Sequence, residues 1–151
     1  MITNNFKKVI TTRLSSLTSS PRVQIIATDG TTKDVSISNA MLASYSETGY
    51  NGVCRFAIGS GTKQATQEDT ALEERITEGY TNTGTVTHTD NAILIQGAIT
   101  NTGTETITIS EYGIIQAPES TYNFLITRKT LTTPVELAPG KVLSLTTRLI
   151  F

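Results

Sequence analysis

Alternating apolar and polar residues make up most of the chain after residue 20, in short runs separated by turn-forming residues. In residues 53–59, VCRFAIG, the side chains of Cys54, Phe56 and Ile58 fall on one face, as in a half-buried strand. Further runs of this kind, such as AILIQGAITN and KVLSLTTRLIF, follow Gly79. Several short strands joined by turns indicate a sandwich or a small barrel. We expect a mainly β fold, an antiparallel β-sandwich that forms one domain over residues 21–151.

Turn signals lie between these runs. Asp29-Gly30 stands between VQIIA and KDVSI, and Asp-Gly favours a two-residue hairpin turn. Asp90-Asn91 and Pro139-Gly140 separate later strand-like runs in the same way. Each of these pairs therefore predicts a reversal of the chain between neighbouring strands.

The N-terminal segment is amphipathic, with apolar side chains at helical spacing over residues 5–17: Phe6, Val9, Ile10, Leu14 and Leu17. Thr11 and Thr12 are poor helix formers, so a frayed arm or a Thr-rich strand is the competing interpretation. Residues 1–20 are thus expected to form an arm or helix that could anchor the protein. The five apolar side chains would dock on a partner or lie on the chain's own domain, and the sequence leaves both placements open.

A second, short helix is predicted at about residues 67–78. Thr66 occupies a capping position with Asp69 three residues later, and Leu72 and Ile76 form one apolar edge. The preceding Gly59 and Gly61 do not form a phosphate-binding loop, because no Lys-Ser/Thr pair follows them. We interpret the two glycines as turn residues that let the chain leave the sheet.

Composition supports β structure and argues against several classes of partner. Only 17% of the residues are charged, and threonine, which suits the outward face of a sheet, is the most frequent residue type. The net charge is −1 and the basic residues are dispersed, which argues against direct nucleic-acid binding. No run approaches the ~18 apolar residues of a membrane span. Cys54 is the only cysteine, which excludes an intrachain disulfide and a Cys-based zinc site.

Candidate catalytic chemistry is sparse. His88 is the sole histidine and alternates with threonines, as an exposed or sheet-edge residue does. No G-x-S-x-G pattern occurs, and the acidic residues at 68–78 lack the spacing of a calcium-binding loop. We therefore predict no catalytic residue, no cofactor and no metal site, and we do not expect an enzyme. The tyrosines are dispersed, which favours mixed core and rim packing over a sugar-stacking surface.

One ordered set of residues resembles a domain recurrent in structural proteins of tailed bacteriophages. In that family a strand ends in a Gly-rich turn, followed by a D-t-x-L segment, a strand closing on E-x-G, an L-x-R strand and a P-v-x-L-x-P-G turn. The match covers residues 53–151, and the first 50 residues resemble the lead-in segment of similar proteins in phages of gut bacteria. The residues that carry the resemblance are Gly59, Gly61, Asp69, Leu72, Glu111, Gly113, Arg128, Pro134, Leu137, Pro139 and Gly140.

The resemblance implies a β-sandwich building block of the virion, of the kind found in head fibres, collars and tail-associated proteins. It implies no catalytic residue. We therefore expect a virion protein, made in the host cytoplasm, that assembles as a homo-oligomer and with other virion proteins of the capsid, portal or collar, or tail. The alternative is a carbohydrate-binding or host-adhesion module of similar fold that uses exposed tyrosines.

Overall fold

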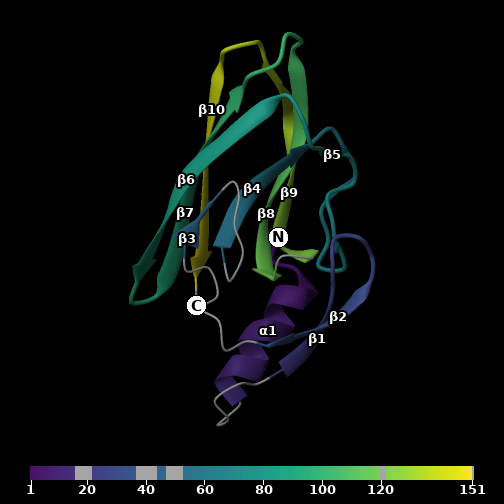
Figure 1. Ribbon diagram of the computed structural model, residues 1–151, viewed down its shortest axis with the longest axis vertical. Coiled ribbons are helices and arrows are strands. Elements are labelled where there is room, and N and C mark those ends of the chain that lie inside the picture. The colour runs from purple at the N-terminus through teal and green to yellow at the C-terminus, as the bar shows by residue number, and fades with distance from the viewer. Residues whose placement is uncertain (16–21, 37–43, 47–52, 120–121, 151) are drawn as a thin grey trace.

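The computed structural model of the protein describes residues 1–15, 22–36, 44–46, 53–119 and 122–150 (Figure 1). It contains one helix and ten strands in the described residues. In chain order they are α1 (Asn4–Ser15), β1 (Arg22–Ile26), β2 (Thr32–Ser36), β3 (Ser44–Tyr45), β4 (Val53–Gly59), β5 (Arg75–Ile76), β6 (Tyr80–Thr89), β7 (Ala92–Asn101), β8 (Ile107–Glu119), β9 (Tyr122–Leu137) and β10 (Val142–Ile150).

Two packed sheets form the body of the molecule. The three-stranded sheet has the order β10-β7-β6, and the five-stranded sheet has the order β3-β4-β8-β9 with β5 beside β4. Every pair is antiparallel except the short β3–β4 pair. In Figure 1, β6 and β7 lie to the left and β8 and β9 to the right, with α1 below them. The prediction of a mainly β, antiparallel, sandwich-like fold is confirmed.

The core lies between the facing sides of the two sheets. Ile95 and Ile99 of β7 and Leu145 and Leu149 of β10 are buried there, on alternate positions of their strands. They belong to one cluster with Phe56 of the five-stranded sheet. Burial of alternate residues is the period of two that the sequence displays, and it accounts for the success of the strand predictions.

A small polar bridge crosses the core between the sheets. The Tyr45 hydroxyl donates to Oδ1 of Asn82, and Nδ2 of Asn82 donates to the carbonyl of Phe56 at 2.6 Å. Gly84 and Gly97 pair in register on the inner side of the three-stranded sheet, where the rings of Tyr45 and Phe56 occupy the space that side chains would need. The absent side chains thus allow the two aromatic rings to approach the backbone of the opposite sheet.

The hairpin and tight-turn predictions are confirmed, with one difference of length. Asp90-Asn91 joins β6 to β7 directly, and Pro139-Gly140 lies between β9 and β10, with Gly140 at a positive φ of 73°. Five residues (27–31) rather than two separate β1 from β2. Within them the amide of Ala27 donates to the carbonyl of Thr31, and the amide of Gly30 donates to the carbonyl of Ala27 and closes the turn. Gly30 takes the positive φ, 81°, that this turn requires.

The predicted helix at 67–78 is wrong. Residues 60–74 form an extended loop with isolated turns, and Arg75–Ile76 form β5 beside β4. The Thr66–Asp69 pair does form the expected local contact, since the Thr66 amide donates to the Asp69 carboxylate at 2.8 Å. Helix does not follow because the amides of Glu73 and Glu74 donate to the side chain of Glu111 instead of to preceding carbonyls.

We predict that Gly97→Ala destabilises the fold by about 1–3 kcal/mol, because overpacking a filled core strains it. A Cβ atom at Gly97 would lie 2.6 Å from the Phe56 ring. The measurement is the free energy of unfolding in urea. Gly103→Ala is the matched control, since the nearest atom to its Cβ would be 3.4 Å away; it should change stability by less than about 0.5 kcal/mol. Equal effects of the two substitutions would contradict the prediction.

Candidate functional site

The densest group of ionisable side chains surrounds Arg128 of β9. Its Nε donates to Glu111 Oε2 at 2.7 Å, Nη1 to Asp69 Oδ2 at 2.8 Å, and Nη2 to the carbonyl of Lys63 at 2.9 Å. Glu73 Oε2 lies 3.7 Å from Nη2. The side chains of Arg128 and Glu111 are 2% and 0% exposed. Each nitrogen of the guanidinium therefore has its own acceptor, in a buried setting.

Glu111 extends this group to the backbone of the loop at 60–74. Its Oε1 accepts from the amide of Glu74 at 2.8 Å and its Oε2 from the amide of Glu73 at 3.2 Å. The two ends of the loop are joined where the amide of Ser60 donates to the carbonyl of Glu74 at 2.9 Å. The carboxylate thus fixes the conformation of a segment that has no regular secondary structure.

Two glycines make room for the Glu111 side chain. A Cβ atom would lie 2.5 Å from Glu111 Oε1 at Gly59 and 2.6 Å from the same atom at Gly61. Neither Gly59 nor Gly61 is among the described glycines that have a positive φ. Close approach of the carboxylate, rather than a special turn conformation, therefore explains both residues. This corrects the interpretation of Gly59 and Gly61 as turn residues.

Several, but not all, of the residues that carry the resemblance meet in this one place. Asp69, Glu111 and Arg128 are joined by the hydrogen bonds given above. Gly113 faces Leu72, whose Cδ2 would be 3.2 Å from an added Cβ. Residues that are distant in the sequence thus form a single structural cluster, which holds the loop on β8 and β9.

Hydrogen bonds set the charge state of this cluster. Burial raises the pKa of Asp69, but hydrogen bonds from Thr66 and Arg128 outweigh burial and hold the pKa below its ordinary value. Burial lowers the pKa of Arg128, whereas its bonds to Asp69 and Glu111 raise it to a net upward shift. The group is therefore held in its charged form at Asp69 and at Arg128. It fixes the loop and leaves Glu111 without exposed surface to meet a substrate.

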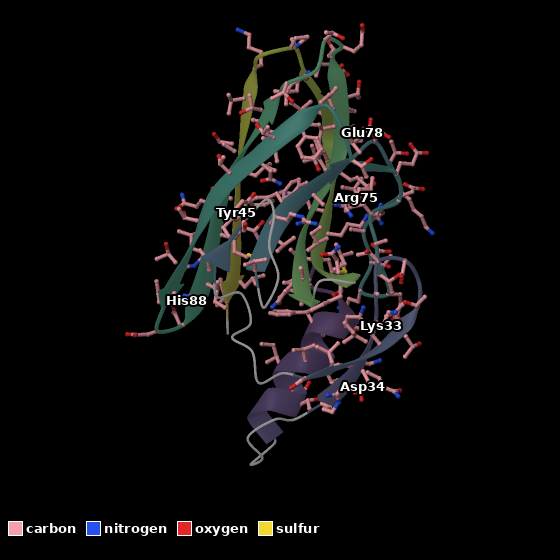
Figure 2. The ribbon with its side chains drawn as sticks, in the orientation of Figure 1. Lys33, Asp34, Tyr45, Arg75, Glu78 and His88 are labelled. Atoms are coloured by element: carbon pink, nitrogen blue, oxygen red, sulfur yellow. The ribbon has the colours of Figure 1, made fainter. Side chains whose placement is uncertain are left out.

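The other candidate chemical groups do not converge. Figure 2 shows His88 at the end of β6, on the opposite side of the molecule from Glu78 and Asp34. His88 is exposed. Within the described residues, no three His, Cys, Asp or Glu side chains are grouped closely enough to hold a metal ion. Cys54 is buried, and burial raises its pKa to about 12.

The tyrosines whose side chains the structure describes are partly buried, not fully exposed on the surface. Tyr45, Tyr80 and Tyr112 are partly buried against the core cluster. The Tyr112 ring meets Phe56 edge-on, with 6.2 Å between the ring centroids. Tyr50 and the side chain of Tyr122 lie outside the described residues.

The predicted docking residues at the N-terminus are placed as follows. Phe6 and Val9 of α1 are each 1% exposed and belong to the chain's own core, and Ile10 is partly buried against it. Leu17, and the side chain of Leu14, lie outside the described residues. Of the two placements left open by the sequence, Phe6 and Val9 take the one on their own domain. A partner that meets α1 would contact its exposed side, which includes Lys7, Lys8 and Thr11.

The N-terminal residues also cover part of the β9 edge. The amide of Thr3 donates to the carbonyl of Ile126 at 2.9 Å, and the amide of Arg128 donates to the carbonyl of Met1 at 3.0 Å. Ile2 forms a bridge with Thr127. This segment of β9 is therefore paired by the chain itself.

The three-stranded sheet, in contrast, has two long edges. In the described part of the chain, no strand pairs with the outer edge of β6 or of β10. The outward face of this sheet carries threonines at alternate positions of β6 and one charged side chain, Arg148 of β10. Edges of this kind offer unpaired backbone donors and acceptors to another strand. The strand patterns identify these strands, but they contain no signal for the strand order that makes β6 and β10 the edges.

Comparison with models of protein families, with curated proteins and with solved structures gives no match to this chain. The described residues include no helix with the length and hydrophobicity needed to span a bilayer.

We predict that Arg128→Met destabilises the protein by about 3–5 kcal/mol, because it leaves the Glu111 carboxylate buried without a cation. The measurement is urea unfolding at neutral pH. Arg22→Met is the matched control, since Arg22 and Asp34 form an ion pair whose side chains are 56% and 55% exposed; its loss should be under about 1 kcal/mol. A loss at Arg128 no larger than that at Arg22 would contradict a structural role for the cluster.

A pH dependence follows from Asp69. Its pKa is lower in the folded protein than the ~3.9 of an unfolded aspartate. The stability it contributes is therefore complete above about pH 4 and is lost as the pH falls through the folded-state pKa. Asp69→Asn should be less stable than wild type at pH 7, and the difference should shrink toward pH 3. Asp34→Asn is the control, and a difference between wild type and Asp69→Asn that is equal at pH 3 and pH 7 would refute the assignment.

Proposed function

We propose that the protein is a structural component of a bacteriophage particle, a head, neck or tail accessory protein that assembles through contacts with itself and with other virion proteins. The observation that carries the proposal is the three-stranded sheet. Its two long edges are unpaired in the described residues, and its outward face holds one charged side chain. Such edges favour pairing with another chain, because the backbone groups of each copy can satisfy those of its neighbour.

The clustered motif residues support the resemblance on which the proposal also draws. Gly59, Gly61, Glu111 and Arg128 are explained by one contact, in which a buried carboxylate lies against two glycines and binds a guanidinium. An ordered motif with a shared structural reason is a better basis for a domain resemblance than separate degenerate matches. The motif residues stabilise the domain, and the unpaired edges are the surfaces through which we propose it assembles.

The carbohydrate-binding alternative draws less support from the described surface. It requires aromatic rings that are free to stack on sugars. Tyr45, Tyr80 and Tyr112 are instead partly buried against the core. We therefore keep assembly as the proposed function.

Mass spectrometry of purified phage particles tests the proposal. The protein should co-purify with the particles through a density gradient at a fixed ratio to the major capsid protein, because a structural component has a defined copy number. Uninfected host lysate taken through the same gradient is the control. Recovery of the protein only in the soluble fraction would exclude a role in the virion, and binding on a glycan array would favour adhesion instead.

A further inference from the structure

We propose that two copies of the chain pair through β10, antiparallel about a two-fold axis at Thr146, so that their three-stranded sheets join into one. The proposal rests on the proposed function and deepens it, since it names the partner at one sheet edge as a second copy. It commits to one edge of the sheet and to one register.

The β10 edge is built for pairing. β10 runs from Val142 to Ile150 along the edge of the sheet, beside β7 (Figure 1). Its register with β7 is uninterrupted over all nine residues, and the strand contains no proline. Bulges, prolines and charged side chains are the usual devices that protect an edge strand, and of these β10 has one, the charged side chain of Arg148.

Exposed apolar side chains stand at both ends of this strand. Val142 is 57% exposed and Ile150 is 63% exposed, the highest values among the large apolar side chains of the described residues. Both lie on the outward face, because they alternate with the buried Leu145 and Leu149. A partner strand that extends over the whole of β10 would contact both residues.

Self-pairing over the whole of β10 covers both Val142 and Ile150. Thr146 is the central residue of β10, so a two-fold axis there sets Val142 opposite Ile150 of the second copy, twice in each dimer. Residues directly opposite each other in an antiparallel pair share a face and interact. The pairing therefore covers all four exposed apolar side chains, and it is self-complementary, as a two-fold interface must be.

The remaining pairs are compatible with this register. Thr146 faces its own copy, and Ser144 faces Arg148 of the second copy, so no two like charges are directly opposed. On the inward side Leu143 faces Leu149. A groove of about 270 Å³ is lined by residues 146–149 of this strand and, among others, by Ile2, Thr127 and Lys129.

The other edge of the sheet, β6, lacks this complementarity. None of the large exposed apolar side chains of the described residues lies on β6. Its outward positions are threonines, which water satisfies as well as a partner does. The proposal therefore assigns the homodimer contact to β10 and leaves β6 outside it.

Charge substitution at the axis tests the edge and the partner together. Thr146 is exposed on the outward face, so T146K and T146E should fold normally. Each variant alone should be monomeric by light scattering, because the axis opposes two like charges. A 1:1 mixture should recover the dimer as a heterodimer. T85K, on the outward face of β6, is the matched control and should dimerise like wild type.

Cysteine crosslinking tests the register. T146C should form a disulfide dimer on mild oxidation, whereas V142C should not crosslink with itself but should crosslink in a mixture with I150C. The native Cys54 is buried with a pKa of about 12, so it does not compete. The double variant V142T/I150T should raise the dimer Kd by about tenfold or more, since it removes the covered apolar groups.

Several outcomes would overturn the proposal. They are a wild-type chain that stays monomeric at its highest soluble concentration, loss of the dimer in T85K but not in T146K, and crosslinking of V142C with itself. These experiments can also distinguish a failure of the β10 contact from a failure of the proposed function. A chain found in particles but monomeric, or dimeric through β6, refutes only the β10 contact, and a β10 dimer absent from particles refutes only the virion role.

Discussion

The ion pair between Arg128 and Glu111 is the contact on which the organisation of the five-stranded sheet depends. Removing two charges from water is costly, so a buried pair persists only where further hydrogen bonds satisfy it. Here the further bonds come from the amides of Glu73 and Glu74 and from the Asp69 carboxylate, all in the loop between β4 and β5. The main chain of Arg128 also binds Met1. One residue of β9 thereby links its neighbouring strand, a long loop and the N-terminal segment.

The same pair marks the limit of what sequence patterns predict. Strand alternation identifies most of the sheet, because burial on one face imposes a local period of two. The false helix at 67–78 has genuine local signals in Thr66, Asp69 and Leu72. They fail because Glu111, 37 and 38 residues away, takes the amides that a helix would use. The reason for Gly59 and Gly61 is equally distant in the sequence. The ordered motif contains these residues, but their order in the sequence does not predict that they are in contact.

The two sheets differ in how their edges are finished. The five-stranded sheet has residues 1–3 against β9 and the short β3 and β5 at its other side. The three-stranded sheet has long, regular edges, and its attachment to the other sheet runs through the bridge of Tyr45 and Asn82 and through apolar packing. Under the proposed function, assembly through the three-stranded sheet would leave the core contacts independent of the partners. Strand order, which local sequence does not encode, decides which sheet has long unpaired edges.

The N-terminal contacts have a consequence for biosynthesis. The hydroxyl of Thr3 donates to the carbonyl of Leu125 at 2.6 Å, across 122 residues of chain. At a translation rate of about 5–20 residues per second, roughly 6 to 24 s pass before that acceptor is made. During this interval the hydrophobic side of α1, with Phe6 and Val9, has no docking surface on β9. Nascent chains therefore pass through an interval in which this side of α1 cannot yet make its contacts with β9.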